Sequence, residues 1–445
     1  MWKSRLFAHD LLVNSLSSSL QQFPNLWKFA VRGHGVFKFS PNNHFYRKRS
    51  TASFKTRSVK NYFLVFDAQC LQTKTRERGI GVYSMNFIES LCKLKPNLSF
   101  AAVLTTVASD IDLKIAVNAL KKLECPNLDI FVFDPFLGSS KISFDTALEN
   151  LKLQLEELRT RAIIVLSPFE KHKSAVTFPF SVKYKQIGIL YDIIPLEYSQ
   201  DFLISRNQMT SYAWSVQNLS KFDLLFAIST KTKDAWNRQI VSRARLKVIY
   251  GGGHIKLTEN IPRFKNRSGV LCVSAEQPHK NLARLIESYC LLPEYIQLEH
   301  TLTIVGIRSS GARKKFAKLG RSASGKIVFT EYLNETKLKD KYRESRLLVM
   351  PSLTEGLSLP ILEAWSYGLV AVGSEGTVAA ELLKNNSLLF NPFSSHAISN
   401  CMRIFLTSEE DWNKAFEVAT SSAACFTWEA TATLAYSEIE RLLDG

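Results

Sequence analysis

Short apolar segments alternate with helical segments along most of this chain, and this alternation constrains the fold more than any other feature. The series begins with "YFLVFDA" at residues 62–68, continues with a helical pattern at 79–94, and returns to an apolar run at 98–107. Short buried strands separated by amphipathic helices are typical of parallel β-α-β units. The series ends at "LKVIYGGGH", residues 246–254. We therefore predict a doubly wound parallel sheet in the first half.

A second series of the same kind follows a polar break at residues 258–268, which contains Pro262. It runs from the apolar segment at 269–275 to the one at 369–374. Two doubly wound units joined by a linker leave a cleft between them. Ligands of such sheets bind at the carboxyl ends of the strands, so both units can face this cleft.

Composition excludes several classes of protein. The chain has 445 residues, of which 46% are hydrophobic and 22% charged, as in ordinary globular proteins of two or three domains. Its seven cysteines include no C-x-x-C pair, which argues against a structural zinc site and for a reducing compartment. Apolar runs stay below the roughly 18 residues that a membrane-spanning helix needs. The sequence therefore predicts a soluble or peripheral protein.

The net charge of +17 is concentrated near the start of the chain, where residues 1–60 hold eleven lysines and arginines and one acid. We expect this leader to be mostly irregular. It has the composition of a transit peptide, but a basic membrane-surface arm and a mis-assigned start near Val59 stay open as alternatives. Basic character suits anionic partners, including sugar nucleotides and acidic lipid headgroups. Beyond the leader no basic stripe carries interleaved aromatics, so no nucleic-acid partner is expected.

The segment "LLVMPSLTEGLSLPILEAWSYGL", residues 347–369, carries the most chemistry. An apolar strand gives way to a loop and then to a helix that begins near Ser358. Ser358 suits the N-cap, Pro360 the first helical turn, and Gly368 the position after the helix. Free amides and the helix dipole make such a helix start an anion site. Gly356 would allow a close approach of the backbone to a ligand.

Two glutamates flank this helix start. A carboxylate at either position, Glu355 or Glu363, can accept hydrogen bonds from the vicinal hydroxyls of a ribose or a hexose. Taken alone, the pair is more simply explained by the positive helix terminus and by solvent exposure.

The whole segment, with "VAVGS" and "ELLKNNSLLFNP" after it, resembles the donor-binding segment of retaining glycosyltransferases of family 4 (glycosyl transferases group 1). Four more segments resemble this family in the same order: "RERGIGVYSMNFIESL" at 76–91, "LYDIIPLEY" at 190–198, "FAISTKTKD" at 226–234 and "CVSAEQPHKNLARLIESY" at 272–289. The resemblance covers about residues 62–443.

The resemblance implies a GT-B fold, in which two Rossmann-like doubly wound domains face a central cleft. The expected boundaries are an extension at 1–60, an acceptor domain at 61–257, a linker at 258–268, a donor domain at 269–426, and a helix at 427–445 that crosses back. The implied catalytic residues are Lys280, Glu355 and Asp192. Donor binding is assigned to Glu363, Gly356, Leu357, Ser358, Leu359, Gly79, Gly81 and Arg78.

Each assignment has a simpler alternative. Lys280 could be a surface lysine, Gly79 and Gly81 turn glycines, and Asp192 the cap of the loop before Pro195. His279 and His254 are more simply structural or solvated than catalytic.

The sequence also departs from the family at two places. Ala275 or Glu276 stands where members often carry an arginine that grips the diphosphate. Tyr191 replaces the histidine that commonly precedes the aspartate, which puts the selectivity of the donor pocket in doubt.

The resemblance implies transfer of a hexose (mannosyl, rhamnosyl or glucosyl) from a UDP- or GDP-sugar to a saccharide or polyprenyl-linked acceptor, with retention, in cell-surface polysaccharide or lipopolysaccharide biosynthesis. The protein would then lie in the cytoplasm, as a peripheral protein on the anionic cytoplasmic face of the inner membrane. No cofactor and no metal is expected, with Lys280 and the helix terminus in place of Mg²⁺. A UDP-sugar epimerase and a non-catalytic sugar-nucleotide binder stay open as alternatives. Motifs for zinc hydrolysis, P-loop phosphoryl transfer and the α/β-hydrolase elbow are absent from the sequence.

Overall fold

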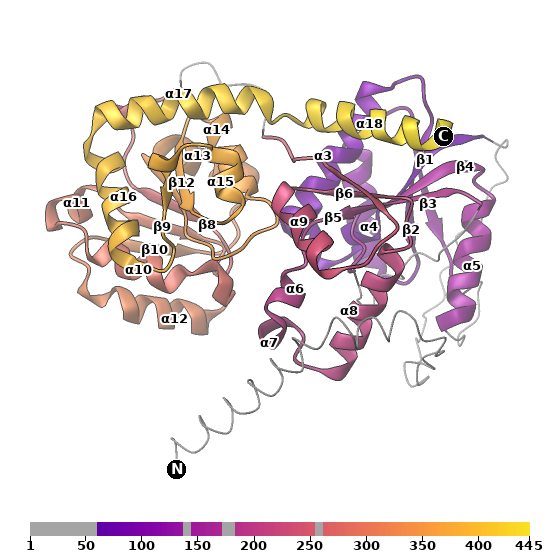
Figure 1. The fold of residues 1–445 in the computed structure, drawn as a ribbon, viewed down its shortest axis with the longest axis horizontal. Helices are drawn as coiled ribbons and strands as arrows, with labels where there is room; N and C mark the ends of the chain where they lie inside the picture. Colours follow the sequence, from indigo (N-terminus) through magenta and orange to yellow (C-terminus); the bar gives the residue numbers. More distant parts are fainter. Residues whose placement is uncertain (1–59, 137–143, 171–182, 254–260) are drawn as a thin grey trace, which may run out of the picture.

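The computed structural model describes residues 60–136, 144–170, 183–253 and 261–445, so the leader, His254 and part of the expected linker lie outside the described residues. The described chain forms two lobes, each built on a parallel sheet with helices on both faces (Figure 1). We call them the N-terminal and the C-terminal domain after their order in the chain.

The described strands of the N-terminal domain form one sheet in which every neighbouring pair is parallel. In spatial order they are β3 (Leu128–Phe133), β2 (Phe100–Thr105), β1 (Tyr62–Asp67), β4 (Thr160–Val165), β5 (Lys185–Leu190), β6 (Leu224–Ala227) and β7 (Arg245–Val248). The order reverses direction at β1, which makes the sheet doubly wound.

The helices of this domain connect successive strands. They are η1 (Gln69–Gln72), η2 (Lys74–Glu77), α3 (Gly79–Leu94), α4 (Asp110–Lys121), α5 (Phe144–Glu156), α6 (Ile194–Glu197), α7 (Ser199–Phe202), α8 (Arg206–Leu219) and α9 (Thr230–Gln239). The predicted helix at 79–94 coincides with α3, whose buried face repeats at helical spacing through Tyr83, Phe87 and Leu91.

The C-terminal domain repeats this architecture with shorter strands. Its sheet has the order β10 (Ile327–Thr330), β9 (Leu302–Val305), β8 (Val270–Val273), β11 (Leu347–Met350), β12 (Val370–Ser374) and β13 (Leu389–Phe390), again parallel throughout. Its helices are η3 (Phe264–Asn266), η4 (Pro278–Lys280), α10 (Leu282–Cys290), α11 (Glu294–Glu299), α12 (Ser310–Leu319), η5 (Gly320–Ser322), α13 (Glu335–Glu344), α14 (Leu359–Ser366), α15 (Val378–Leu383), η6 (Asn386–Leu388), α16 (Ser395–Thr407) and α17 (Glu409–Cys425).

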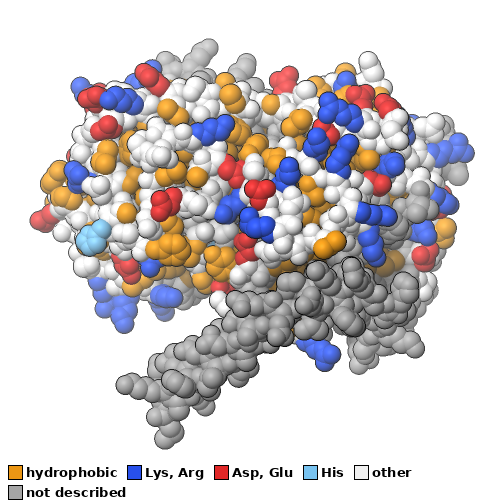
Figure 2. Space-filling model, viewed as in Figure 1, with side chains coloured by type: hydrophobic (Ala, Val, Ile, Leu, Met, Phe, Trp, Pro, Cys, Tyr) orange, Lys and Arg blue, Asp and Glu red, His pale blue; other side chains and the backbone are white. Residues whose placement is uncertain are grey.

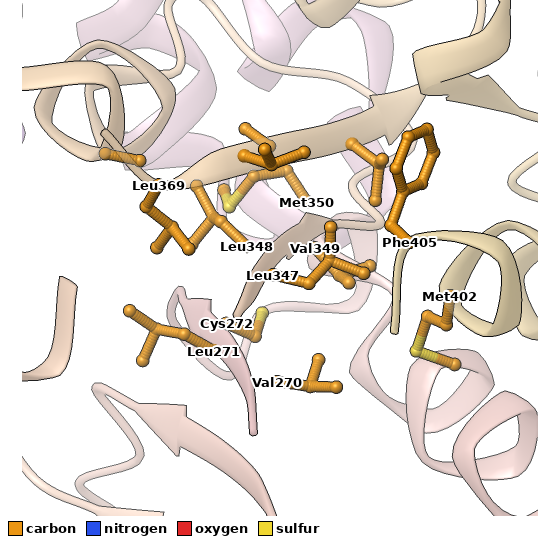
Figure 3. Packing of buried hydrophobic residues seen from close by; sticks show 14 of the residues in the cluster. Val270, Leu271, Cys272, Leu347, Leu348, Val349, Met350, Leu369, Met402 and Phe405 are labelled. Atoms are coloured by element: carbon orange, nitrogen blue, oxygen red, sulfur yellow. The ribbon is translucent and has the colours of Figure 1, made fainter. Parts of the chain in front are cut away.

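The core of the C-terminal domain explains why its strands read as continuous apolar runs. All four residues of β11 are buried, because helices cover both faces of the sheet. Figure 3 shows side chains of β8 and β11 packed together, with Met402 and Phe405 of α16 beside them. These buried strands fix the position of the loops that follow them.

The last helix, α18 (Trp428–Asp444), leaves the C-terminal domain and lies on the N-terminal one, as Figure 1 shows in yellow. Ala432, Ala435 and Ile439 are fully buried against the N-terminal core. The Trp428 ring meets the Tyr83 ring edge-on, with 4.9 Å between centroids. The crossing helix therefore ties α3 to the end of the chain.

No single kind of charged side chain dominates the face of the molecule drawn in Figure 2. On the face drawn in Figure 2, lysine and arginine side chains occur on both lobes and are mixed with acidic ones. Within the described ranges, no helix is long and apolar enough to cross a membrane.

Candidate active site

The loop between β11 and α14 forms the centre of the candidate site. β11 ends at Met350 and α14 begins at Leu359, with Pro360 in its first turn and Gly368 at a φ of +62° just beyond its end. Ser358 occupies the N-cap position, but its side chain makes no capping bond. The Ser358 hydroxyl is buried and has no hydrogen-bond partner among the described residues. In the first turn of α14, Pro360 has no N–H and the Ile361 amide donates to the Ser358 carbonyl oxygen at 3.0 Å. The donors that this helix start can offer to an anion are therefore the backbone amides of Leu357, Ser358 and Leu359, just before and at its first residue.

A buried ion pair joins this loop to the neighbouring strand. Lys280, in the turn after β8, donates from Nζ to Oε1 of Glu355 at 2.9 Å, and the Ser352 hydroxyl donates to the same oxygen at 2.6 Å. The exposed fractions of the two side chains are 22% for Lys280 and 6% for Glu355. Because β8 and β11 are adjacent parallel strands, their carboxyl ends bring these two residues together across 75 positions of sequence.

Glu363 lies in α14 and has a different partner. The hydroxyl of Tyr342 donates to Glu363 Oε2 at 2.6 Å, and the Tyr342 ring stacks on Tyr367 at 5.7 Å. Burial raises the pKa of Glu363 to about 7, although the bond from Tyr342 opposes the rise. The two glutamates thus differ in environment: Glu355 is paired with a cation, and Glu363 is held by a neutral hydroxyl.

Gly356 is required by a contact between the domains. A Cβ at this position would lie 1.9 Å from the carbonyl oxygen of Tyr191, so any side chain would push the loop away from the N-terminal domain. The side chains of Leu357 and Leu359 pack against the hydrophobic cores of both domains. The close approach seen here is to the N-terminal domain, and the expected approach of this glycine to a ligand stays a prediction.

The start of α3 faces the same region from the N-terminal domain. Gly79 is the first residue of α3, and a Cβ there would lie 3.4 Å from the side chain of Leu359. Gly81 has no room for a side chain, since a Cβ would lie 2.3 Å from the Arg76 carbonyl oxygen. Arg78 is exposed and precedes the helix. The helix starts of α3 and α14 thus approach each other through Gly79 and Leu359.

Asp192 follows β5 and lies in a turn. Its Oδ1 accepts a hydrogen bond from the Ile194 amide at 3.0 Å. Asp192 therefore caps the loop before Pro195, as the simpler explanation of this residue predicted. Burial raises the pKa of Asp192, and the nearby positive charge of Lys280 partly opposes this rise. Asp192 therefore holds its own loop through a hydrogen bond and also interacts electrostatically with Lys280.

His279, which the sequence argument set aside, lies next to Lys280 at the candidate site. It is 6% exposed, and its Nδ1 has no hydrogen-bond partner within the described parts of the chain. Its ring lies 5.5 Å from that of Phe202 and 6.4 Å from that of Tyr198, both in the N-terminal domain. Burial and the charge of Lys280 lower the pKa of His279 to about 4, so the ring is neutral at pH 7. In the sequence, the feature that pointed to a place of His279 near the site was its position next to Lys280 in "PHKN".

The two departures from the family pattern have visible consequences. Tyr191 points into the N-terminal domain, where its hydroxyl bonds the Ser84 hydroxyl at 3.2 Å and its ring meets Tyr83 edge-on. Glu276 accepts a hydrogen bond from the Ser309 amide at 3.1 Å.

Taken together, the described residues of the candidate site present one ammonium group and the hydrogen-bond donors of a helix start. No three histidine, cysteine, aspartate or glutamate side chains within the described ranges gather as metal ligands would. One ammonium group and one helix start stand at the meeting of two domains. Such an arrangement can hold a phosphorylated ligand and stabilise negative charge that develops on it.

Part of the chain matches a family of known proteins. Residues 256–420 match the family described as glycosyl transferases group 1. The chain is 25% identical over 417 residues to the serotype-specific mannosyltransferase WbdA of Escherichia coli, covering 86% of this chain and 48% of that protein. It is 31% identical over 169 residues to the O-antigen chain mannosyltransferase B of Escherichia coli, covering 37% of this chain and 43% of that protein. The chain thus spans about half the length of these curated relatives.

Solved structures share the two-domain fold. The sucrose-phosphate synthase of Thermosynechococcus elongatus superposes with a TM-score of 0.64 at 14% identity, covering 86% of this chain and all of that one. Anabaena HepE in complex with UDP and glucose superposes with a TM-score of 0.61 at 17% identity, covering 85% of this chain and all of that one. The chain therefore has the GT-B fold predicted from its sequence, and its residues 256–420 match the glycosyl transferases group 1 family.

Proposed function

We propose that this protein is a retaining hexosyltransferase that moves a mannosyl group from a nucleoside-diphosphate sugar to a saccharide or polyprenyl-linked acceptor in cell-surface polysaccharide synthesis. The match to the glycosyl transferases group 1 family supports the reaction class. The names of the relatives, which are mannosyltransferases, favour mannose over rhamnose and glucose. We further propose that it acts without a metal ion, in the cytoplasm beside the membrane that carries the acceptor.

The observation that carries the proposal is the position of Lys280. Its ammonium group is held 2.9 Å from Glu355, which lies in the loop that leads to the start of α14. In the proposed complex the diphosphate lies between Lys280 and the amides of Leu357, Ser358 and Leu359. The helix dipole and the ammonium charge would together stabilise the diphosphate as it leaves.

The two glutamates would divide the recognition of the donor. Glu355 would turn from Lys280 to the hydroxyls of the sugar, and Glu363 would accept from the ribose. Glu363 would play this role in its ionised form, which donation from two ribose hydroxyls stabilises, so binding would lower its raised pKa. Gly79, Gly81 and Arg78 would complete the diphosphate site from the N-terminal domain.

Retention sets the geometry of the transfer step. The acceptor hydroxyl oxygen forms the new bond to the anomeric carbon on the face from which the diphosphate departs. The bond from that carbon to the diphosphate oxygen breaks, and the hydroxyl proton passes to the departing diphosphate. Asp192, near Lys280, would orient the acceptor or a sugar hydroxyl. The chain's task in this step is to hold charge and position, not to form a covalent intermediate.

A donor and acceptor assay tests the proposal. The protein is incubated with GDP-mannose, UDP-glucose or dTDP-rhamnose, with and without an alkyl mannoside acceptor, and products are identified by mass spectrometry and NMR. We expect an α-linked mannoside from an α-linked donor, formed only with acceptor present. An epimerised donor without acceptor would identify an epimerase, and binding without turnover would identify a sugar-nucleotide binder. Either result would refute the proposed transfer.

A further inference from the structure

At the N-terminus of α9, a carboxylate of the C-terminal domain accepts two backbone hydrogen bonds from the N-terminal domain. Glu381, in α15 of the C-terminal domain, accepts from the amide of Thr230 through Oε2 at 2.9 Å and from the amide of Lys231 through Oε1 at 2.6 Å. Both amides belong to the first turn of α9 in the N-terminal domain. A carboxylate that takes both free amides of a helix start is well placed with respect to the helix dipole.

Three further hydrogen bonds surround this contact. The hydroxyl of Tyr250 donates to Glu381 Oε2 at 3.0 Å and lies 2.9 Å from the Thr230 hydroxyl. Lys231 Nζ donates to the carbonyl oxygen of Gly376, in the turn before α15, at 2.5 Å. The contact is thus made by several groups on each side.

The same turn of α9 also holds the candidate site together. The buried Thr232 hydroxyl shares its one proton between two carbonyl oxygens, that of Tyr191 at 3.1 Å and that of Gly356 at 3.4 Å. Tyr191 precedes Asp192 in the N-terminal domain, and Gly356 follows Glu355 in the C-terminal domain. One helical turn is therefore bonded to Glu381 at its amides and to both halves of the site through a single side chain.

We propose that Glu381 is a positioning residue. Its carboxylate fixes the start of α9 on the C-terminal domain, and this sets the relative position of the donor loop at Gly356 and the strand end at Tyr191. This role rests on the proposed function, because the relative position matters for turnover only if the donor and the acceptor are brought together there. Glu381 itself touches neither Lys280 nor Glu363. Its loss should therefore act on the transfer step more than on the binding of the nucleotide.

The contact can be tested without any enzymatic assay. Hydrogen–deuterium exchange is followed by mass spectrometry in peptides covering residues 226–236 for wild type, Glu381→Ala, Glu381→Gln and Glu375→Gln. Glu375 is an exposed glutamate in the turn before α15, so its variant changes the same charge without touching α9. We expect exchange at the start of α9 to accelerate at least tenfold in Glu381→Ala, less in Glu381→Gln, which keeps one acceptor oxygen, and not in Glu375→Gln.

Kinetics and binding then test the positioning role. In Glu381→Ala we expect kcat to fall at least tenfold, while the Kd for UDP or GDP changes less than threefold and Glu381→Gln recovers part of the turnover. A variant whose fold is simply damaged would lose nucleotide binding as well. Unchanged exchange in Glu381→Ala would overturn the contact, and accelerated exchange with unchanged kcat would overturn the positioning role. If wild type transferred no sugar, the proposed function would fail. The hydrogen–deuterium exchange experiment would still decide whether Glu381 holds the start of α9.

Discussion

Replacing Lys280 by methionine separates the chemical role of this residue from its structural one. The substitution keeps most of the side-chain volume but removes the ammonium group that lies 2.9 Å from Glu355. Glu355 would then keep only the Ser352 hydroxyl on Oε1 while 6% exposed. Breaking a buried ion pair from one side costs about 3–5 kcal/mol. Because Lys280 is 22% exposed, we expect a loss of roughly 2–3 kcal/mol in the free energy of unfolding.

The effect on turnover should be larger than the effect on stability. Removing one group that stabilises charge in a transition state costs about 3–4 kcal/mol, or a factor of about 10²–10³ in kcat. Initial rates at saturating donor give kcat, and urea unfolding gives the stability. The double variant Lys280→Met/Glu355→Gln serves as the control, since it removes the uncompensated charge. We expect it to recover most of the stability and none of the turnover.

Two results would refute this reasoning. If Lys280→Met turned over within threefold of wild type, Lys280 would not stabilise the leaving diphosphate. If the double variant regained turnover together with stability, the loss in the single variant would come from the damaged loop rather than from the missing ammonium charge.

Other perturbations have equally definite outcomes. Because the folded protein keeps a proton on Glu363 up to about pH 7 that the unfolded chain loses near 4.5, wild-type stability should fall across this range, and Glu363→Gln should flatten that fall in urea unfolding at pH 5 and 7.5. Gly356→Ala places a methyl group 1.9 Å from the Tyr191 carbonyl oxygen, so transfer should drop about 100-fold, and an unchanged rate would contradict the domain contact. Trp428→Ala removes a ring that is 6% exposed and should cost about 3–5 kcal/mol of stability, measured by calorimetry, if α18 is an integral part of the N-terminal core. EDTA should leave transfer unchanged, whereas a loss that Mg²⁺ restores would contradict the metal-free proposal.

Local sequence patterns predicted the strands and helices well where their periodicity was strong. The helix at 79–94 coincides with α3, and the apolar run at 347–350 is β11. Weaker patterns were not identified in advance, including α17, although Ser408 followed by Glu409, Glu410 and Asp411 is a typical helix start. The GT-B fold itself followed from the resemblance of five segments.

Contacts between distant residues were beyond reach of such patterns. Lys280 and Glu355 were both expected in the site, but their direct pairing depends on the adjacency of β8 and β11 in the sheet. Gly356 was expected to approach a ligand, and its approach to Tyr191 depends on how the two domains meet. Neither arrangement leaves a periodic signal in the sequence.

Side-chain detail also differed from expectation where local propensity was the only guide. Ser358 stands at the N-cap, yet the backbone there has a φ of −97° and a ψ of 77°, and the hydroxyl makes no capping bond. His279 was set aside because an isolated histidine is usually structural, and its burial beside Lys280 became visible only in three dimensions.

The central claim is that Lys280 and the start of α14 hold a diphosphate, and calorimetric titration tests it most directly. Wild type and Lys280→Met are titrated with UDP, GDP and the corresponding nucleosides. We predict that wild type binds one of the two diphosphates much more tightly than its nucleoside, and that Lys280→Met loses at least tenfold of this preference. Equal affinity of wild type and variant for that diphosphate would contradict the claim.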